Sequence, residues 1–183
     1  NPVMRELFLV RHAESDLDPT IPPEGWGLTS NGVQQARDAG NELRNAGLVA
    51  IFCSAEPKAQ RTADLIAGAV GLRSREIEGL GEHRRDSWGF LGRDEFNRAV
   101  GEVFDAPGES VLGAETGKPA LRRFNDAIVE ADRKSPPGAI ALVSHGTVMS
   151  LVLSHLNDEP AGPIWEAMDF AQVFRIGWVA PAD

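Results

Sequence analysis

Residues 7–14 read Leu-Phe-Leu-Val-Arg-His-Ala-Glu, in which an apolar run over residues 7–10 is followed directly by two basic side chains. A strand that is covered on both faces of a sheet is continuous in apolar residues rather than alternating. The run therefore predicts a buried strand over residues 7–10. Because ligands of open α/β sheets bind beyond the carboxyl ends of the strands, we expect Arg11 and His12 at the ligand-binding edge.

Three later runs of the same character predict further strands, over residues 48–52, 139–143 and 173–179. The last of these fits an edge strand of either direction. Stretches with apolar residues at helical spacing separate the runs, over residues 33–46, 59–70 and 121–131. We expect the first helix to end at Gly47, a natural C-cap, and the second to carry Pro57 in its first turn. Strands that alternate with helices indicate an α/β fold, a three-layer sandwich with a mostly parallel central sheet flanked by helices.

The composition favours one well-packed domain over residues 1–183. The hydrophobic fraction is 42%, and a chain of this size buries about 70% of its surface on folding. No apolar run approaches the roughly 20 residues that cross a bilayer, so we expect no membrane segment. A net charge of −9 disfavours nucleic acid as a partner, because its phosphates would be repelled.

The chain contains a single cysteine, Cys53, so neither an intramolecular disulfide nor a cysteine-based zinc site is expected. Residues 7–10 are too short for the apolar core of a signal peptide, which favours a cytoplasmic protein. No exposed apolar stripe stands apart from the core pattern, so the sequence does not indicate an oligomeric state.

Two of the four histidines directly follow predicted strands. His12 follows the first apolar run, and His145 follows the run over residues 139–143 after one serine. Since the carboxyl ends of parallel strands meet at one edge of a sheet, we expect both imidazoles at the same edge. The alternative interpretation is that each histidine only caps a turn, and the shared placement disfavours it.

Four segments resemble a known family in the right order. Residues 11–14 resemble the RHG(E) signature of the histidine phosphatase superfamily, which has the phosphoglycerate-mutase-like fold. Residues 28–36, 54–63 and 143–148 are similar to its LTxxGxxQA, SPLxRAxxTA and VSHGGV segments. Together they cover the chain from residue 5 to about residue 155.

The resemblance implies a reaction at phosphorus without a metal or other cofactor. His12 would be the nucleophile and form a phosphohistidine that water then cleaves. It must be neutral to attack, and cationic neighbours such as Arg11 disfavour its protonated form. Arg11 would bind the phosphoryl oxygens, His145 would add a charged hydrogen bond, and the backbone N–H groups of Gly146 and Thr147 would attract the anion at a helix start.

The leaving group needs a proton, for which the resemblance indicates Glu82. A carboxyl group beside bound phosphate would have its pKa raised by like charge, as a general acid at neutral pH requires. His83 is the competing proton donor, and a solvated loop glutamate is the alternative interpretation of Glu82.

Several positions depart from the family pattern. Lys58 stands where the family has its second phosphate-binding arginine, which keeps the charge but gives up the bidentate fork. Arg61, three residues on, is an alternative source of that guanidinium. Ala13 replaces a glycine after His12, and Thr147 replaces the second glycine after His145.

Two irregular stretches, residues 15–28 and 79–94, are long connections of the kind that often carry function. In family terms the second covers the catalytic pocket and selects the substrate. Five side chains of these stretches are candidate pocket residues: Asp18, Trp26, Arg84, Arg85 and Trp88. An aromatic ring there would stack on part of the substrate, or else pack in a small satellite core.

The sequence thus predicts a metal-independent phosphatase that hydrolyses small phosphomonoesters through a phosphohistidine. The alternatives are a phosphotransferase of the phosphoglycerate mutase type, a phosphohistidine protein phosphatase and a phosphate-binding module without catalysis. The sequence does not rank the physiological substrates.

Overall fold

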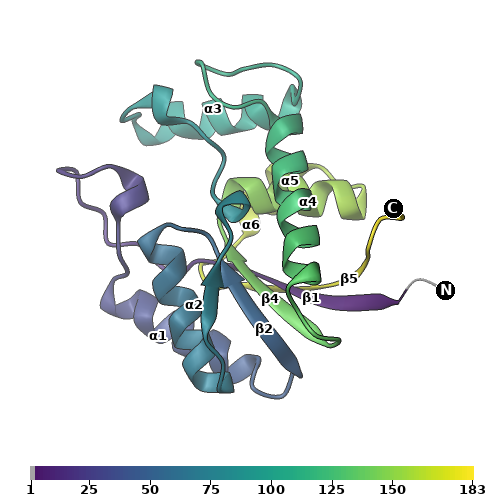
Figure 1. Cartoon of the computed structure of the whole chain (residues 1–183). Coiled ribbons are helices and arrows are strands. Elements are labelled where there is room, and N and C mark those ends of the chain that lie inside the picture. Colours follow the sequence, from purple (N-terminus) through teal and green to yellow (C-terminus); the bar gives the residue numbers. More distant parts are fainter. Residues whose placement is uncertain (1–2) are drawn as a thin grey trace.

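The computed structural model describes residues 3–183, in which five strands form one sheet between two layers of helices (Figure 1). The strands are β1 (Met4–Arg11), β2 (Leu48–Cys53), β3 (Ser74–Glu76), β4 (Ala139–Ser144) and β5 (Val173–Val179). Their order across the sheet is β3-β2-β4-β1-β5, and every neighbouring pair is parallel except β1 and β5. The predicted α/β class with a mostly parallel sheet is confirmed.

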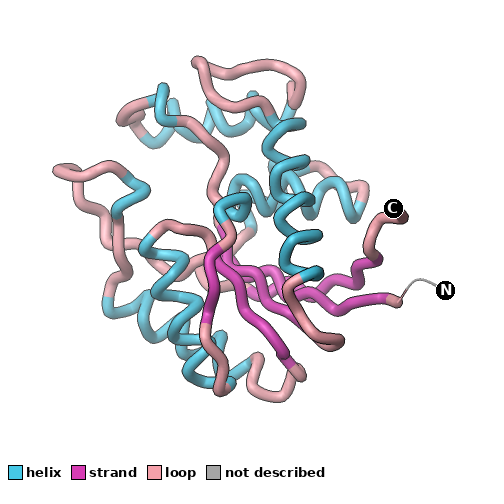
Figure 2. Tube along the Cα trace, in the orientation of Figure 1, coloured by secondary structure: helices cyan, strands magenta, loops and turns pink. Residues whose placement is uncertain are grey.

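The helices are α1 (Ser30–Glu42), α2 (Pro57–Val70), α3 (Arg93–Asp105), α4 (Gly117–Arg133), α5 (Gly146–Asn157) and α6 (Ala161–Ala167). Helices α1 and α2 lie on one side of the strands, and α4, α5 and α6 on the other (Figure 2). Short 3-10 helices occur at η1 (Pro23–Gly25), η2 (Glu78–Leu80) and η3 (Asp86–Trp88). Helix α3 stands away from the sheet (Figure 1).

The packing of both faces of strand β1 explains why its sequence is continuously apolar. Phe8 and Val10 pack in the cluster beneath α1 and α2, whereas Leu7 and Leu9 pack in the cluster beneath α4 and α5. Successive side chains point to opposite faces of a strand, so both faces are covered. Strand β5 differs: its residues are half-buried or exposed, as befits an edge strand, and it runs antiparallel to β1.

The N-terminus of α1 is fixed by Thr29, whose side chain accepts a hydrogen bond from the Gly32 backbone N–H. The predicted end at Gly47 is wrong, because α1 ends at Glu42 and the buried Leu43 is its C-cap. Gly47 has φ +72° in the turn that leads into β2, so its left-handed conformation serves that turn.

Residues 79–94 are less irregular than predicted. They contain the end of η2, all of η3 and the first two residues of α3. Around them lies a satellite core, which we call the cap core, formed by buried side chains of η3, α3 and the following loop: Trp88, Ala99, Val100, Val103, Val111 and Ala114. The described helices include none that is long and apolar enough to cross a membrane.

Candidate active site

His12 lies directly beyond the carboxyl end of β1 and is buried. Its Nδ1 is 2.7 Å from the Ala13 carbonyl oxygen, which can only accept, so Nδ1 carries the proton and Nε2 keeps its lone pair. The pKa of His12 is lowered to about 4, chiefly by burial and then by the charges of Lys58 and Arg11. The ring is therefore neutral at pH 7, as the sequence predicted, although burial contributes more than the cations.

His145 follows β4 and lies against His12, with the ring centroids 5.1 Å apart. Its Nε2 is hydrogen-bonded to the Ser54 hydroxyl at 2.6 Å. Burial and the neighbouring His12 hold the pKa of His145 well below its usual value. In this structure His145 is thus neutral, which differs from the charged hydrogen-bond donor expected from the sequence.

The guanidinium of Arg11 is held between the end of β1 and the start of α5. It donates to the Met168 carbonyl oxygen and lies 4.3 Å from the Phe170 ring centroid. Its buried Nε has no hydrogen-bond partner among the described residues. A Cβ atom on Gly146 would stand 3.2 Å from this Nε, so the missing side chain at Gly146 makes room for Arg11.

Lys58 lies in the first turn of α2 and is buried. Its ammonium donates to the Pro23 carbonyl oxygen at 3.1 Å, lies 3.4 Å from a Glu56 carboxylate oxygen and is 5.5 Å from the Trp26 ring centroid. The charge of Lys58 lowers the pKa of both His12 and His145, which places it in their electrostatic environment.

Arg61 does not join this group. It is exposed, whereas Lys58, Ala59 and Thr62 on the same helix are buried. The position three residues after Lys58 has turned away from the buried face. The side chain of Arg61 makes no hydrogen bond or ion pair with any described residue. The structure therefore brings Lys58, and not Arg61, to the histidines.

Glu82 is bound as a carboxylate at the N-terminus of α5. One oxygen accepts from the backbone N–H groups of His83 and Val148, both at 2.8 Å, and the other accepts from that of Thr147 at 3.0 Å. Arg85 lies 3.8 Å away. Against the opposing effect of burial, the Arg85 charge, His145 and these N–H groups lower the pKa of Glu82 to about 2.

This arrangement corrects two expectations. The predicted raised pKa of Glu82 assumed bound phosphate, whereas the structure holds Glu82 ionised. The N–H of Thr147, which the sequence assigned to phosphate, already donates to Glu82. A helix N-terminus attracts anions, and in this structure the anion bound at the α5 N-terminus is the Glu82 carboxylate.

Three other candidates point elsewhere. His83 is buried with its Nε2 bound to the Glu115 carbonyl oxygen, and burial lowers its pKa. Asp18 is partly exposed and accepts hydrogen bonds from the backbone and hydroxyl of Thr20. Arg84 lines a hollow of about 520 Å³ beside α4, whose lining does not include His12.

Arg85 and Trp88 connect the site to the cap core. Arg85 donates to the Thr147 hydroxyl at 2.9 Å and lies over the rings of Trp88 and Phe96. Trp88 is buried and donates from Nε1 to the Val111 carbonyl oxygen. The satellite-core interpretation of Trp88 therefore holds, and Arg85 joins Glu82 at the α5 N-terminus.

Sequence reasoning missed two parts of the site. Phe170, 5.9 Å from His12 between ring centroids, and Met168 precede β5, and the antiparallel direction of β5 brings them to the end of β1. The sequence left the direction of β5 open, so it did not indicate that Met168 and Phe170 would lie beside His12 and Arg11. Glu56, whose carboxylate is 3.6 Å from His145 Nδ1, lies in the family-like segment 54–63, but the sequence did not mark it as a site residue.

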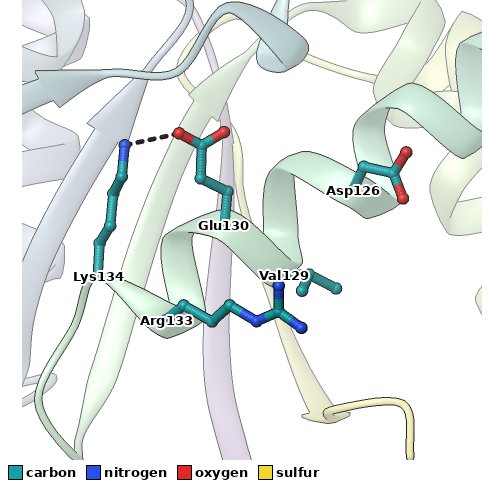
Figure 3. A pocket seen from close by; sticks show the side chains of 5 residues that line it. All are labelled: Asp126, Val129, Glu130, Arg133 and Lys134. Atoms are coloured by element: carbon teal, nitrogen blue, oxygen red, sulfur yellow. Dashed lines mark hydrogen bonds and ion pairs between the residues drawn. The ribbon is translucent and has the colours of Figure 1, made fainter. Parts of the chain in front are cut away.

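A second hollow, of about 410 Å³, lies on the outer face of α4 (Figure 3). Its lining consists of Asp126, Val129, Glu130, Arg133 and Lys134. The Lys134–Glu130 ion pair, at 2.6 Å, spans one turn of its wall. None of these residues is among those described around His12 and His145. In the described part of the chain, no group of three or more His, Cys, Asp or Glu side chains is arranged to hold a metal ion.

Two buried neutral histidines thus lie at the carboxyl ends of parallel strands, with an arginine and a lysine beside them. The chain belongs to the histidine phosphatase superfamily (branch 1), whose family description matches residues 7–179.

Relatives by sequence carry mutase names. A probable phosphoglycerate mutase GpmB from Yersinia pestis is 31% identical over 172 residues, which is 86% of this chain and 77% of that protein. A 2,3-bisphosphoglycerate-dependent phosphoglycerate mutase from Bradyrhizobium diazoefficiens is 35% identical over 106 residues, which is 54% of this chain. The match spans only about half, 51%, of the latter protein's length.

Solved structures with the same fold carry phosphatase names. A mycobacterial glucosyl-3-phosphoglycerate phosphatase superimposes with a TM-score of 0.76 and 20% identity, over 93% of this chain and 90% of that one. A phosphoserine phosphatase from Entamoeba histolytica superimposes with a TM-score of 0.73 and 18% identity, over 97% and 95%. At these identities the likeness concerns the fold.

Proposed function

We propose that this protein is a metal-independent phosphatase that hydrolyses small phosphomonoesters through a phosphohistidine at His12. The observation that carries the proposal is the state of His12: a neutral ring whose Nδ1–H is fixed on a carbonyl oxygen, which leaves a nucleophilic Nε2 beside two cations. A nucleophile that is deprotonated at neutral pH and set in a positive field suits attack on a phosphoryl group.

Three groups would bind the phosphoryl oxygens. Arg11 has an Nε without a hydrogen-bond partner in the described part of the chain, Lys58 carries a buried ammonium, and His145 lies against the nucleophile. Fixed positive charge in a site that largely excludes water stabilises the transferring phosphoryl group more than the same charge in bulk water does. The net charge of −9 elsewhere on the chain favours small substrates over long polyanions.

The test is hydrolysis of p-nitrophenyl phosphate by wild-type protein and His12→Ala, each with and without EDTA. We expect phosphate release that EDTA leaves unchanged and that His12→Ala abolishes. Rapid alkaline quenching after mixing with labelled substrate should trap a phosphohistidine in the wild type only. Activity that persists in His12→Ala, or that EDTA removes, contradicts the proposal.

A phosphoglycerate mutase is the second candidate, and the names of the relatives that are 29–35% identical favour it. It would use the same nucleophile, so His12→Ala does not separate the two. Incubation with 3-phosphoglycerate does: isomerisation faster than phosphate release identifies a mutase, and the reverse order a phosphatase.

A further inference from the structure

The backbone leaves the sheet immediately after His12, yet its next N–H groups all have partners. The N–H of His12 still donates to the Ser144 carbonyl oxygen of β4, at 2.9 Å. The following two, those of Ala13 and Glu14, donate instead to side chains. An N–H taken out of water without an acceptor costs about 1 to 3 kcal/mol, so these two side chains allow the chain to turn away from the sheet at this point.

The first of these side chains is Gln35, which belongs to α1. Its Oε1 accepts from the Glu14 N–H at 2.9 Å. This N–H and the Ala13 carbonyl belong to the same peptide group, and that carbonyl oxygen is the one that accepts from His12 Nδ1 at 2.7 Å. Gln35 and His12 therefore bind the two ends of one planar unit. Hydrogen bonds in such a chain polarise one another, so the bond to Gln35 strengthens the carbonyl oxygen as an acceptor.

The second side chain is Thr62, which belongs to α2 and is fully buried. Its hydroxyl accepts from the Ala13 N–H at 3.0 Å and donates to the Lys58 carbonyl oxygen at 2.7 Å. Because a hydroxyl has a single proton, the bond to Lys58 takes up that proton and leaves a lone pair of Oγ1 for Ala13. Thr62 thus ties the loop that carries His12 to the helix that carries Lys58.

Helix α1 lies close enough to this loop to hold Gln35 in place. The Glu14 carbonyl oxygen accepts from the Thr29 backbone N–H at 3.1 Å, and the Glu14 carboxylate accepts from the Thr29 hydroxyl at 2.7 Å. A Cβ atom on Gly32 would collide with the Glu14 carbonyl oxygen, so the glycine permits this close approach. Gln35 follows Gly32 by about one helical turn, on a helix whose position relative to His12 is fixed.

We infer that Gln35 and Thr62 are positioning residues for the nucleophile: together they fix the two peptide groups on either side of Ala13 and so keep the proton of His12 on Nδ1. The inference rests on the proposed phosphatase function and on these hydrogen bonds. A neutral imidazole can carry its proton on either nitrogen, and only the form protonated on Nδ1 has a lone pair at Nε2 for attack on phosphorus. Both side chains act through the backbone of the loop, so neither needs to touch the substrate.

The experiment identifies the tautomer of His12 from the ¹⁵N NMR shifts of its two ring nitrogens at pH 7. In the wild type we expect a protonated Nδ1 and an unprotonated Nε2. Gln35→Met removes the acceptor at nearly constant side-chain length, so part of the population should move to the form protonated on Nε2. The kcat for p-nitrophenyl phosphate should then fall about 10- to 100-fold. The inhibition constant of orthophosphate should change less than about threefold, because Arg11 and Lys58 are intact.

Thr62→Val tests the second residue in the same way, because it removes the hydroxyl at nearly constant shape. Two conservative variants should restore the wild-type tautomer and most of kcat: Gln35→Glu keeps an acceptor oxygen, and Thr62→Ser keeps the hydroxyl. The matched control is Gln34→Met. Gln34 is exposed on α1 and its amide binds only Asp38 among the described residues, so this variant should change neither the tautomer nor kcat.

A purely structural role would lower the stability of the variants without moving the tautomer. The inference is overturned if folded Gln35→Met and Thr62→Val keep the wild-type ¹⁵N pattern, or if Gln34→Met loses as much kcat as Gln35→Met. Circular dichroism verifies folding, and the two substitutions lie on different helices, so each can decide without the other. Wild-type protein that releases no phosphate overturns the proposed phosphatase function instead. The ¹⁵N spectra need no substrate and still decide whether the two side chains position the imidazole.

Discussion

The Glu82 carboxylate should stabilise the folded protein strongly, and Glu82→Gln tests this. Its pKa falls from 4.5 to about 2 on folding, and its side chain is 15% exposed, so solvent screens it little. At about 1.36 kcal/mol for each pH unit, the charged carboxylate contributes about 3 kcal/mol at pH 7. Glu82→Gln keeps the shape and removes the charge, so it should lower the free energy of unfolding by about that amount.

The pH dependence of this difference has a definite sign. Because the pKa of Glu82 is depressed in the folded state, the stabilisation is complete above the unfolded value near 4.5 and is lost as the pH falls toward 2. The gap between wild type and Glu82→Gln should stay constant from pH 6 to 8 and shrink to about 2 kcal/mol at pH 3.5.

Equilibrium urea unfolding followed by circular dichroism measures the gap at each pH. Glu78→Gln, at an exposed position of η2 four residues earlier, is the matched control and should differ from wild type by less than about 0.5 kcal/mol. A Glu82→Gln variant within about 1 kcal/mol of wild type at pH 7, or a gap that does not shrink in acid, refutes the reasoning.

Three further predictions concern the site and the core. Lys58→Met removes a charge that lowers the pKa of His12, so NMR titration should show that pKa rising from about 4 toward 6.5. An unchanged pKa would contradict the placement of Lys58 beside His12. Gly32→Ala places a methyl group against the backbone of the loop after β1 and should cost about 1 to 3 kcal/mol in urea unfolding, whereas Gly27→Ala, in open space, should cost much less. Leu142→Ala in fully buried β4 should lower the free energy of unfolding by about 3 kcal/mol, and calorimetry should show a Tm about 6 to 12 °C lower. A Tm that falls by less than about 2 °C would mean that the core closes over the cavity.

The parts of the fold that the sequence predicted are those with both faces buried. Strands β1, β2 and β4 are continuous apolar runs because helices cover both sides of them. Strand β3 reads Ser-Arg-Glu at the edge of the sheet, and three polar residues carry no strand pattern. Helices α3 and α6 were missed because α3 packs on the cap core and on Trp165 rather than on the sheet, and α6 has a single buried residue.

In the site, local motifs predicted that His12, Lys58 and His145 gather and that His12 is neutral, but they did not predict the charge states of His145 and Glu82. The positions of His12, Lys58 and His145 follow from strand ends and helix starts, which the chain encodes locally. The binding of Glu82 at the α5 N-terminus joins segments 65 residues apart, and neither segment alone predicts it. The exposure of Arg61 likewise depends on how α2 rotates against the sheet.

The antiparallel placement of β5 gives the site a late step in its assembly. Every recognised motif has been synthesised by about residue 155, yet the carbonyl and ring that hold Arg11 belong to residues 168 and 170. β1 pairs with β4 and β5 across some 130 to 175 residues of chain, and contacts of such long sequence range form slowly. A ribosome-bound chain that already displays all four motifs therefore still lacks the groups that hold Arg11, and the proposed reactivity of His12 should appear only when β5 has emerged and docked.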